Sequence, residues 1–342
     1  MLFYLQIFIT TLLLTVGLTF LVMKLAKKLK IVDKPDRERK IHDRATPLLG
    51  GLAIFAAFFI ILYFTHDKLL TGDLLPRHWL GFFSGACFLM IGGWLDDKYN
   101  LKPAWQIIWP ALAIVSVIAG GVQIEKITNP FGGFIYLGAL SAVLIALWLL
   151  GMMYTTKLLD GLDGLVSGMT AIGALVIFLF TMSEKYYQPD IGLAALILAA
   201  ATLGFLFFNW HPAKIFLGEG GSLFLGYALG VLSIISGGKI AIALLVMGIP
   251  VLDVAWTIIR RLVAGKNPFR FADNKHLHFR LLNMGLGVKK SVLLFYGVSI
   301  IFGLSALFLQ SQGKALALAA LLAIMISVIM FFAYLDRKNK VV

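Results

Sequence analysis

The sequence contains few charged residues and no long polar stretch. Charged residues make up only 14% of its 342 residues, against about a quarter in soluble domains. Hydrophobic residues make up 60%, and the mean hydropathy is +0.91. These values exclude an ordinary soluble protein, and the missing polar stretch argues against a separate soluble domain. The single cysteine, Cys87, excludes an internal disulfide, and its apolar neighbours predict a small buried side chain.

The first apolar stretch, Leu2 to Met23, also lacks a basic leader and a small-residue cleavage site. Lysines follow this stretch rather than precede it, which favours a retained helix over a secretory signal. Runs of about twenty apolar residues, the length that a helix needs to cross a bilayer, recur to the end of the chain. We therefore predict one all-α polytopic membrane domain over residues 1–342. Its predicted spans are eleven: 2–23, 48–65, 78–95, 104–121, 136–153, 166–182, 191–208, 222–236, 240–258, 291–310 and 315–335.

The basic residues gather on one side of this predicted topology. Of the 30 Lys and Arg, 24 fall in alternate connecting segments and the C-terminal tail, which predicts that these segments are cytoplasmic and that the N-terminus lies outside. Most of the 17 acidic residues fall on the same side, which indicates a site rather than topology signals alone. Among the short outer loops, residues 122–135 predict a small hairpin. Because the positive charges lie in topology-setting loops without a nucleic-acid-binding module, the net charge of +13 does not indicate nucleic acid as a partner.

One candidate motif is the carboxylate pair Asp96-Asp97 at the end of the third predicted span. Adjacent carboxylates repel each other unless a cation lies between them. Hard oxygen ligands of this kind suit Mg²⁺, which prefers one or two carboxylates together with substrate phosphates and water. The alternative is a helix-end charge cluster neutralised by Lys98 and Lys102.

A second acidic pair lies in the stretch Asp160-Gly161-Leu162-Asp163-Gly164. On a helical turn the two carboxylates are three residues apart and share a face, and the glycines leave room for a ligand to approach the backbone. Ionised groups beside hydrocarbon are costly and are often functional. The alternative is a glycine-rich turn whose acids face water.

The first basic segment could bind an anion. Here we expect Lys40, His42 and Arg44 to approach a phosphate, while Gly50-Gly51 lets the following helix pack closely. The alternative is a solvated basic loop that sets topology and touches lipid headgroups.

The stretch from Asn209 to Ser222 adds another cytoplasmic acid, Glu219, at a span boundary. Its glycines at a helix start would offer backbone N–H groups to a phosphate, and Asn209 and Lys214 are candidate substrate ligands. The alternative is only a tight entry to the next helix.

The last loop contains His276-Leu-His278 and Arg280 beside aromatic residues, after Asp253 near a span end. A zinc site is poorly supported, because no cysteine and few acids could complete tetrahedral coordination. The basic side chains are better suited to hold a pyrophosphate. Carboxylates for Mg²⁺ and basic groups for phosphates at a membrane face together predict phosphoryl transfer.

The same motifs, in this order, resemble those of the polyprenyl-phosphate N-acetylhexosamine-1-phosphate transferases of glycosyltransferase family 4. The resemblance covers about residues 33–285 and rests on Pro47…Gly50-Gly51, Asp96-Asp97, Asp160-Gly-Leu-Asp163-Gly164, Asn209…Pro212-Ala213…Gly218-Glu219-Gly-Gly-Ser222 and His276-Leu-His278…Arg280. The related phospho-N-acetylmuramoyl-pentapeptide transferases of peptidoglycan synthesis are an alternative branch. The histidine loop resembles more closely the branch that starts O-antigen and teichoic-acid linkage synthesis.

The resemblance implies transfer of a HexNAc-1-phosphate, in first place GlcNAc-1-phosphate, from a UDP-sugar to a polyprenyl phosphate, with release of UMP. The implied cofactor is Mg²⁺, with Mn²⁺ as an alternative, and the implied partners are UDP-N-acetylhexosamine, polyprenyl phosphate and the lipid bilayer of the cell membrane. Homodimers occur in the family. The predicted site residues are catalytic Asp96, Asp97, Asp160 and Asp163; metal-binding Asp97, Asp160 and Glu219; and substrate-binding Lys40, His42, Lys157, Asn209, Lys214, His276, His278 and Arg280.

Three residues depart from the pattern of this family, which usually has Asn at Lys157, Asp at Glu219 and His at Phe279. Lys157 would either hold a phosphate or weaken metal binding. Two other functions stay open: an inactive relative that binds lipid or nucleotide, and a transporter. A transporter predicts charges near the bilayer midplane and an internal repeat, whereas the acids here lie at span ends.

Overall fold

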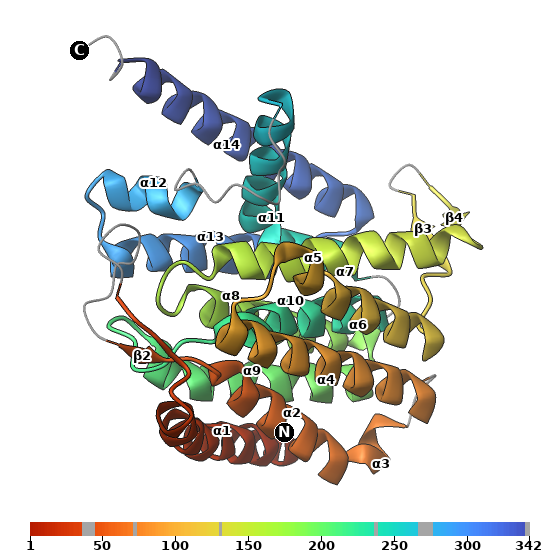
Figure 1. The fold of residues 1–342 in the computed structure, drawn as a ribbon. Helices are drawn as coiled ribbons and strands as arrows, with labels where there is room; N and C mark the ends of the chain where they lie inside the picture. The colour runs from red at the N-terminus through yellow and green to blue at the C-terminus, as the bar shows by residue number, and fades with distance from the viewer. Residues whose placement is uncertain (36–44, 71–73, 130–131, 236–238, 266–275, 339–342) are drawn as a thin grey trace.

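The computed structural model describes residues 1–35, 45–70, 74–129, 132–235, 239–265 and 276–338. The described chain is mostly helical, and its helices pack into one bundle (Figure 1). The helices are α1 Leu2–Lys28, α2 Gly50–Phe64, α3 His66–Leu69, α4 Pro76–Tyr99, α5 Pro103–Gln106, α6 Ile108–Ala119, α7 Leu140–Leu159, α8 Leu165–Thr181, α9 Pro189–Asn209, α10 Gly218–Ile235, α11 Ile240–Val263, α12 Leu277–Asn283, α13 Val288–Phe308 and α14 Ser311–Lys338, with a 3₁₀ turn at Glu184–Tyr186.

Four short strands complete the described structure: β1 Val32–Asp33, β2 Thr46–Pro47, β3 Lys126–Thr128 and β4 Phe134–Tyr136. Strands β3 and β4 pair antiparallel and confirm the hairpin predicted for residues 122–135. Strands β1 and β2 pair antiparallel at the base of the first basic segment. Residues 36–44 lie outside the described residues, so the predictions for Lys40 and His42 stay predictions.

Each predicted span overlaps a helix, which confirms the mostly helical fold. Eight of the described helices are long and apolar enough to cross a membrane: α1, α4, α7, α9, α10, α11, α13 and α14. Three further apolar segments, Gly50–Phe64, Pro103–Ala119 and Leu165–Thr181, are shorter. Cys87 is only half-buried, rather than buried as predicted.

Helix α10 is the centre of the bundle, and every residue from Gly220 to Ile234 is buried. It packs against α7, α4 and α2. Small residues permit the close approach, as is common between membrane helices. A Cβ on Gly51 would lie 2.0 Å from the Gly221 Cα, and a Cβ on Gly93 would lie 2.0 Å from the Gly220 nitrogen. The packing role predicted for Gly50-Gly51 is therefore confirmed, and the α10 glycines serve the same helix contacts.

Candidate active site

A cavity of about 870 Å³ lies where the ends of α4 and α7 meet the start of α10. This volume falls within the range of small-molecule sites, about 300–1,000 Å³. Its lining combines acids, bases and a few aromatic side chains: Asp33, Asp97, Lys157, Asp160, Asp163, Asn209, His211, Lys214, Phe216, Glu219 and Phe279 are among them. The cavity therefore gathers most of the predicted motifs, which are distributed over more than 180 residues of the chain.

The segment before α10 is held against the start of α2 by backbone hydrogen bonds. The Phe216 N–H donates to the Pro47 carbonyl, and the Gly50 and Gly51 N–H groups donate to the Phe216 and Leu217 carbonyls, all at 2.9 Å. These bonds join two cytoplasm-predicted segments that are far apart in the sequence. They fix one wall of the cavity.

Asp97 and Glu219 meet at the crossing of α4 and α10. The Glu219 backbone N–H donates to Asp97 Oδ1 at 3.0 Å. Residue 218 has a positive φ of +75°, and a Cβ there would lie 2.4 Å from Asp97 Oδ2, so both backbone and space require glycine. Asp97 is therefore held in the cavity wall by the start of α10.

Asp96 faces a different way from Asp97. Its Oδ1 accepts hydrogen bonds from the Leu101 N–H at 2.8 Å and the Gln106 side-chain amide at 3.0 Å. Adjacent helical residues point in different directions, and Asp96 does not line the cavity. The structure therefore does not bring the predicted catalytic residue Asp96 to the cavity, but uses it to fold the chain back after α4.

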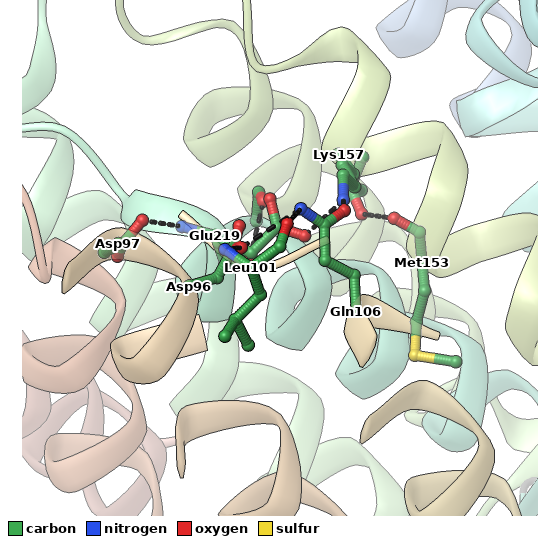
Figure 2. Close-up of polar contacts among 9 residues, drawn as sticks. Asp96, Asp97, Leu101, Gln106, Met153, Lys157 and Glu219 are labelled. Atoms are coloured by element: carbon green, nitrogen blue, oxygen red, sulfur yellow. Dashed lines mark hydrogen bonds and ion pairs between the residues drawn. The ribbon is translucent and has the colours of Figure 1, made fainter. Parts of the chain in front are cut away.

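Lys157 lies in the last turn of α7 and points towards Glu219 (Figure 2). Its Nζ is 2.5 Å from Glu219 Oε1 and donates to Gln106 Oε1 at 3.1 Å. The ammonium is thus in contact with the acid cluster and with the amide that holds Asp96. Lys157 lines the cavity as predicted for a substrate residue, but its ammonium is engaged by protein groups.

The second acidic pair lies in the turn between α7 and α8. Asp163 Oδ2 accepts from the Ala213 N–H at 3.0 Å and pairs with His211 Nδ1 at 2.7 Å. This contact ties the turn to the segment before α10. His211 is not among the site residues predicted from the sequence. The one feature of the sequence that could have indicated a site role for His211 is its place between Trp210 and Pro212, in a polar stretch between two apolar runs.

Asn209 supports the same turn from the end of α9. Its side-chain oxygen accepts from the Gly164 N–H and the Ser167 hydroxyl, and its amide donates to the Ile215 carbonyl. The side chain is buried, so its polar atoms are used within the protein. Asn209 therefore shapes the cavity. Lys214, in contrast, is exposed and lines the cavity, where its ammonium can contact a ligand.

The histidine loop divides between two places. His276 is buried and pairs through Nδ1 with Asp253 Oδ2 at 2.8 Å, which anchors the start of α12. His278 is fully buried against the Asp160 turn, because a Cβ on Gly161 would lie 2.7 Å from its Nε2. Burial lowers the pKa of His278 to about 4.

Arg280 lies away from the acid cavity. It pairs with Asp336 at 3.2 Å, packs on the Phe332 ring, and lines a separate cavity of about 150 Å³. The prediction that Arg280 joins the two histidines in holding a pyrophosphate is not met by this arrangement. Arg280 lies two residues after His278 on α12, a rotation of about 200°, so the two side chains point to opposite sides of the helix.

The donor set of the cavity fits a hard divalent cation. Burial raises the pKa of the Asp160 carboxyl well above its ordinary value, and the charges of Glu219 and Asp97 raise it further. A cation would relieve this repulsion. Within the described residues no three His, Cys, Asp or Glu side chains converge as a complete metal site. Asp97 and Asp160 both line the cavity and are the carboxylates that could hold such a cation together with water and substrate phosphates.

Comparison with known proteins identifies the family. The family model for glycosyl transferase family 4 matches residues 79–237, and a probable undecaprenyl-phosphate N-acetylglucosaminyl 1-phosphate transferase of Bacillus subtilis (strain 168) is 35% identical over 311 residues, covering 89% of this chain and 84% of that protein. The chain belongs to glycosyl transferase family 4. The matched region contains both acidic pairs and Glu219.

Two further relatives are similar over most of their length, and they have different named activities. An undecaprenyl-phosphate alpha-N-acetylglucosaminyl 1-phosphate transferase of Thermotoga maritima is 32% identical over 292 residues, covering 85% of this chain and 86% of that protein. A phospho-N-acetylmuramoyl-pentapeptide-transferase of Oleidesulfovibrio alaskensis is 30% identical over 338 residues, covering 87% and 90%. The family assignment and the apolar helices together make the chain a multi-pass membrane protein.

Proposed function

We propose that this protein transfers N-acetylhexosamine-1-phosphate, in first place N-acetylglucosamine-1-phosphate, from a UDP-sugar to a polyprenyl phosphate and releases UMP. The main support for this proposal is the cavity, whose lining brings Asp97, Asp160 and Asp163 together with Lys214 and His211. Phosphoryl transfer needs positioning and charge neutralisation, and these side chains are suited to both. The names of the relatives at 35% and 32% identity support the substrate classes.

In the proposed reaction, an oxygen of the lipid phosphate attacks the β-phosphorus of the UDP-sugar. The bond from that phosphorus to the bridging oxygen breaks, and UMP leaves with the bridging oxygen. We assign Asp97 to receive the proton of the lipid phosphate, since its carboxylate is held at the cavity wall by the Glu219 N–H. A route through an aspartyl-phosphate intermediate is the alternative, and the trapping of a labelled protein would favour it.

The donor side is assigned to the Asp163 turn. The Asp163–His211 contact fixes the imidazole beside Lys214, which gives the cavity two nitrogen groups for a pyrophosphate. His278 would act through the turn, because its ring packs against Gly161. Mg²⁺, held by Asp97 and Asp160, would supply charge neutralisation at the phosphates.

The proposed topology has eleven spans with the N-terminus outside and the cavity facing the cytoplasm. The excess of Lys and Arg on the cavity side supports this orientation. Cys87 is the single cysteine, so a Cys87→Ser background allows new cysteines at Lys68 and Lys214 to be labelled selectively. An impermeant maleimide applied to intact cells should label position 68 and not 214; the reverse result would invert the topology.

A panel of UDP-sugars tests the function. Purified protein should release UMP from UDP-GlcNAc only when polyprenyl phosphate is present. Release from UDP-MurNAc-pentapeptide instead would favour the second candidate function, to which the relative at 30% identity points. Binding of UDP-sugar without any UMP release would indicate an inactive relative, and substrate flux in proteoliposomes without UMP would indicate a transporter.

A further inference from the structure

Lys157 and Glu219 form an ion pair inside the cavity. Their charged atoms are 2.5 Å apart, and the two side chains are 21% and 16% exposed. The lysine comes from the end of α7 and the glutamate from the start of α10, and these two helices pack against each other. The pair is therefore placed by the helix packing itself.

The lysine is held from a second direction as well. Its Nζ donates to Gln106 Oε1 at 3.1 Å, and the Gln106 amide donates in turn to Asp96 Oδ1 at 3.0 Å (Figure 2). A lysine side chain ordinarily has many rotamers. Here the Glu219 carboxylate and the Gln106 amide, which Asp96 holds in place, together define one position for its ammonium.

The position of this ammonium bears on the binding of a divalent cation. Glu219 Oε1, which faces the lysine, is 2.5 Å from a positive charge. A divalent ion at the same carboxylate would lie within a few ångströms of the ammonium, and like charges at that distance in a partly buried site repel strongly. The Glu219 carboxylate can therefore pair with the ammonium or bind a metal ion, but not both at once.

We propose that Lys157 is a built-in counter-cation that engages Glu219 and keeps it out of the divalent-cation ligand set, leaving Asp97 and Asp160 as the ligands. Lys157 is then a positioning residue: it holds Glu219, whose backbone N–H orients Asp97. This inference rests on the proposed function only in assuming that a divalent cation enters the cavity. The rival arrangement has Lys157 swinging to a substrate phosphate while Glu219 binds the metal.

Binding of Mn²⁺ to the purified protein without substrates separates the two arrangements, with free Mn²⁺ measured by electron paramagnetic resonance. The variants are Lys157→Gln, the double variant Lys157→Gln with Glu219→Gln, and Asp97→Asn, which identifies binding elsewhere. Lys98→Gln is the matched control, since this exposed lysine in the last turn of α4 contacts only the Trp94 and Tyr99 rings among the interactions described.

Lys157→Gln should bind Mn²⁺ about tenfold more tightly than the native protein, a gain of about 1.4 kcal/mol, because Glu219 is then free to bind the ion. The double variant should bind Mn²⁺ within about threefold of the native protein, because two uncharged glutamines replace an ion pair whose net charge is also zero. The Lys98→Gln control should be unchanged. The double variant leaves no buried charge unpaired, so it decides the question even if the single variant fails to purify.

Two results would overturn the inference. One is a double variant that binds Mn²⁺ about tenfold more weakly than native protein, since Glu219 would then be a ligand in the native state. The other is an unchanged affinity in a folded Lys157→Gln protein. UMP release is measured separately on the same preparations, so absence of transfer with the expected Mn²⁺ pattern would refute the proposed function and leave this inference standing.

Discussion

The contact between α4 and α10 permits a sharp test, the substitution Gly93→Ala. A Cβ at this position would lie 2.0 Å from the Gly220 nitrogen and 2.1 Å from its Cα. Both are backbone atoms of a buried helix, so neither can turn aside as a side chain would. The two helices must therefore move apart.

The size of the movement follows from these distances. Restoring an ordinary contact of 3.4 Å from 2.0 Å requires a separation of about 1.4 Å. Asp97 lies one helical turn after Gly93 on the same face, so the same movement would stretch its 3.0 Å hydrogen bond to the Glu219 N–H beyond bonding reach. Overpacking of this kind costs about 1–3 kcal/mol. A displacement of about 1 Å at reacting groups can lower the rate about a hundredfold.

The assay combines thermal unfolding in detergent with UMP release measured well below the unfolding temperature. Gly93→Ala should lower both the unfolding temperature and the rate. Gly151→Ala is the matched control, because a Cβ there meets no other atom within 4 Å, and it should change neither. A Gly93→Ala protein with native stability and native transfer would refute the claim that this crossing builds the site.

Three further substitutions probe other parts of the site. Asp97→Asn keeps an acceptor for the Glu219 N–H and should unfold normally, yet lose transfer by about a hundredfold or more; full transfer would remove Asp97 from the mechanism. The pKa of His278 is about 4 in the folded protein and 6.5 in the unfolded chain, so only the unfolded chain gains the proton as the pH falls from 6.5 to 5. The unfolding free energy should therefore fall by about 2 kcal/mol by pH 5. Denaturant titrations should find this loss absent in His278→Gln and retained in the control His66→Gln, and an equal loss in both variants would contradict the reasoning. Asn209→Ala leaves three buried polar groups without their partner and should cost about 3 kcal/mol or more in unfolding free energy, whereas an unchanged unfolding temperature would show that water replaces the amide.

Much of the fold was predictable, because apolar runs of span length and glycine pairs are local signals. The hairpin within residues 122–136 and the close packing at Gly50-Gly51 were likewise predicted from short stretches. Helix ends were less accurate. The first helix continues to Lys28 rather than Met23, because the lysine, leucine and alanine residues that follow Met23 are good helix formers.

The site was predictable as a set of motifs but not as a set of contacts. Asp96 and Asp97 look equivalent in the sequence, yet helix geometry turns one to Gln106 and the other to the cavity. Two departures from the family pattern, Lys157 and Glu219, appear independent along the chain, and only the packing of α7 against α10 joins them. Such pairings depend on which helices are neighbours, and no local pattern carries that information.

The most direct test of the central claim follows the two phosphates of the donor. Purified protein is given undecaprenyl phosphate and UDP-GlcNAc labelled on either the α- or the β-phosphate. Transfer of the sugar with its phosphate predicts that the β label enters the lipid and the α label leaves as UMP, in equal amounts, and that Asp97→Asn and Asp160→Asn reduce both together. Recovery of both labels in UDP would mean that the sugar moves alone, and would contradict the account.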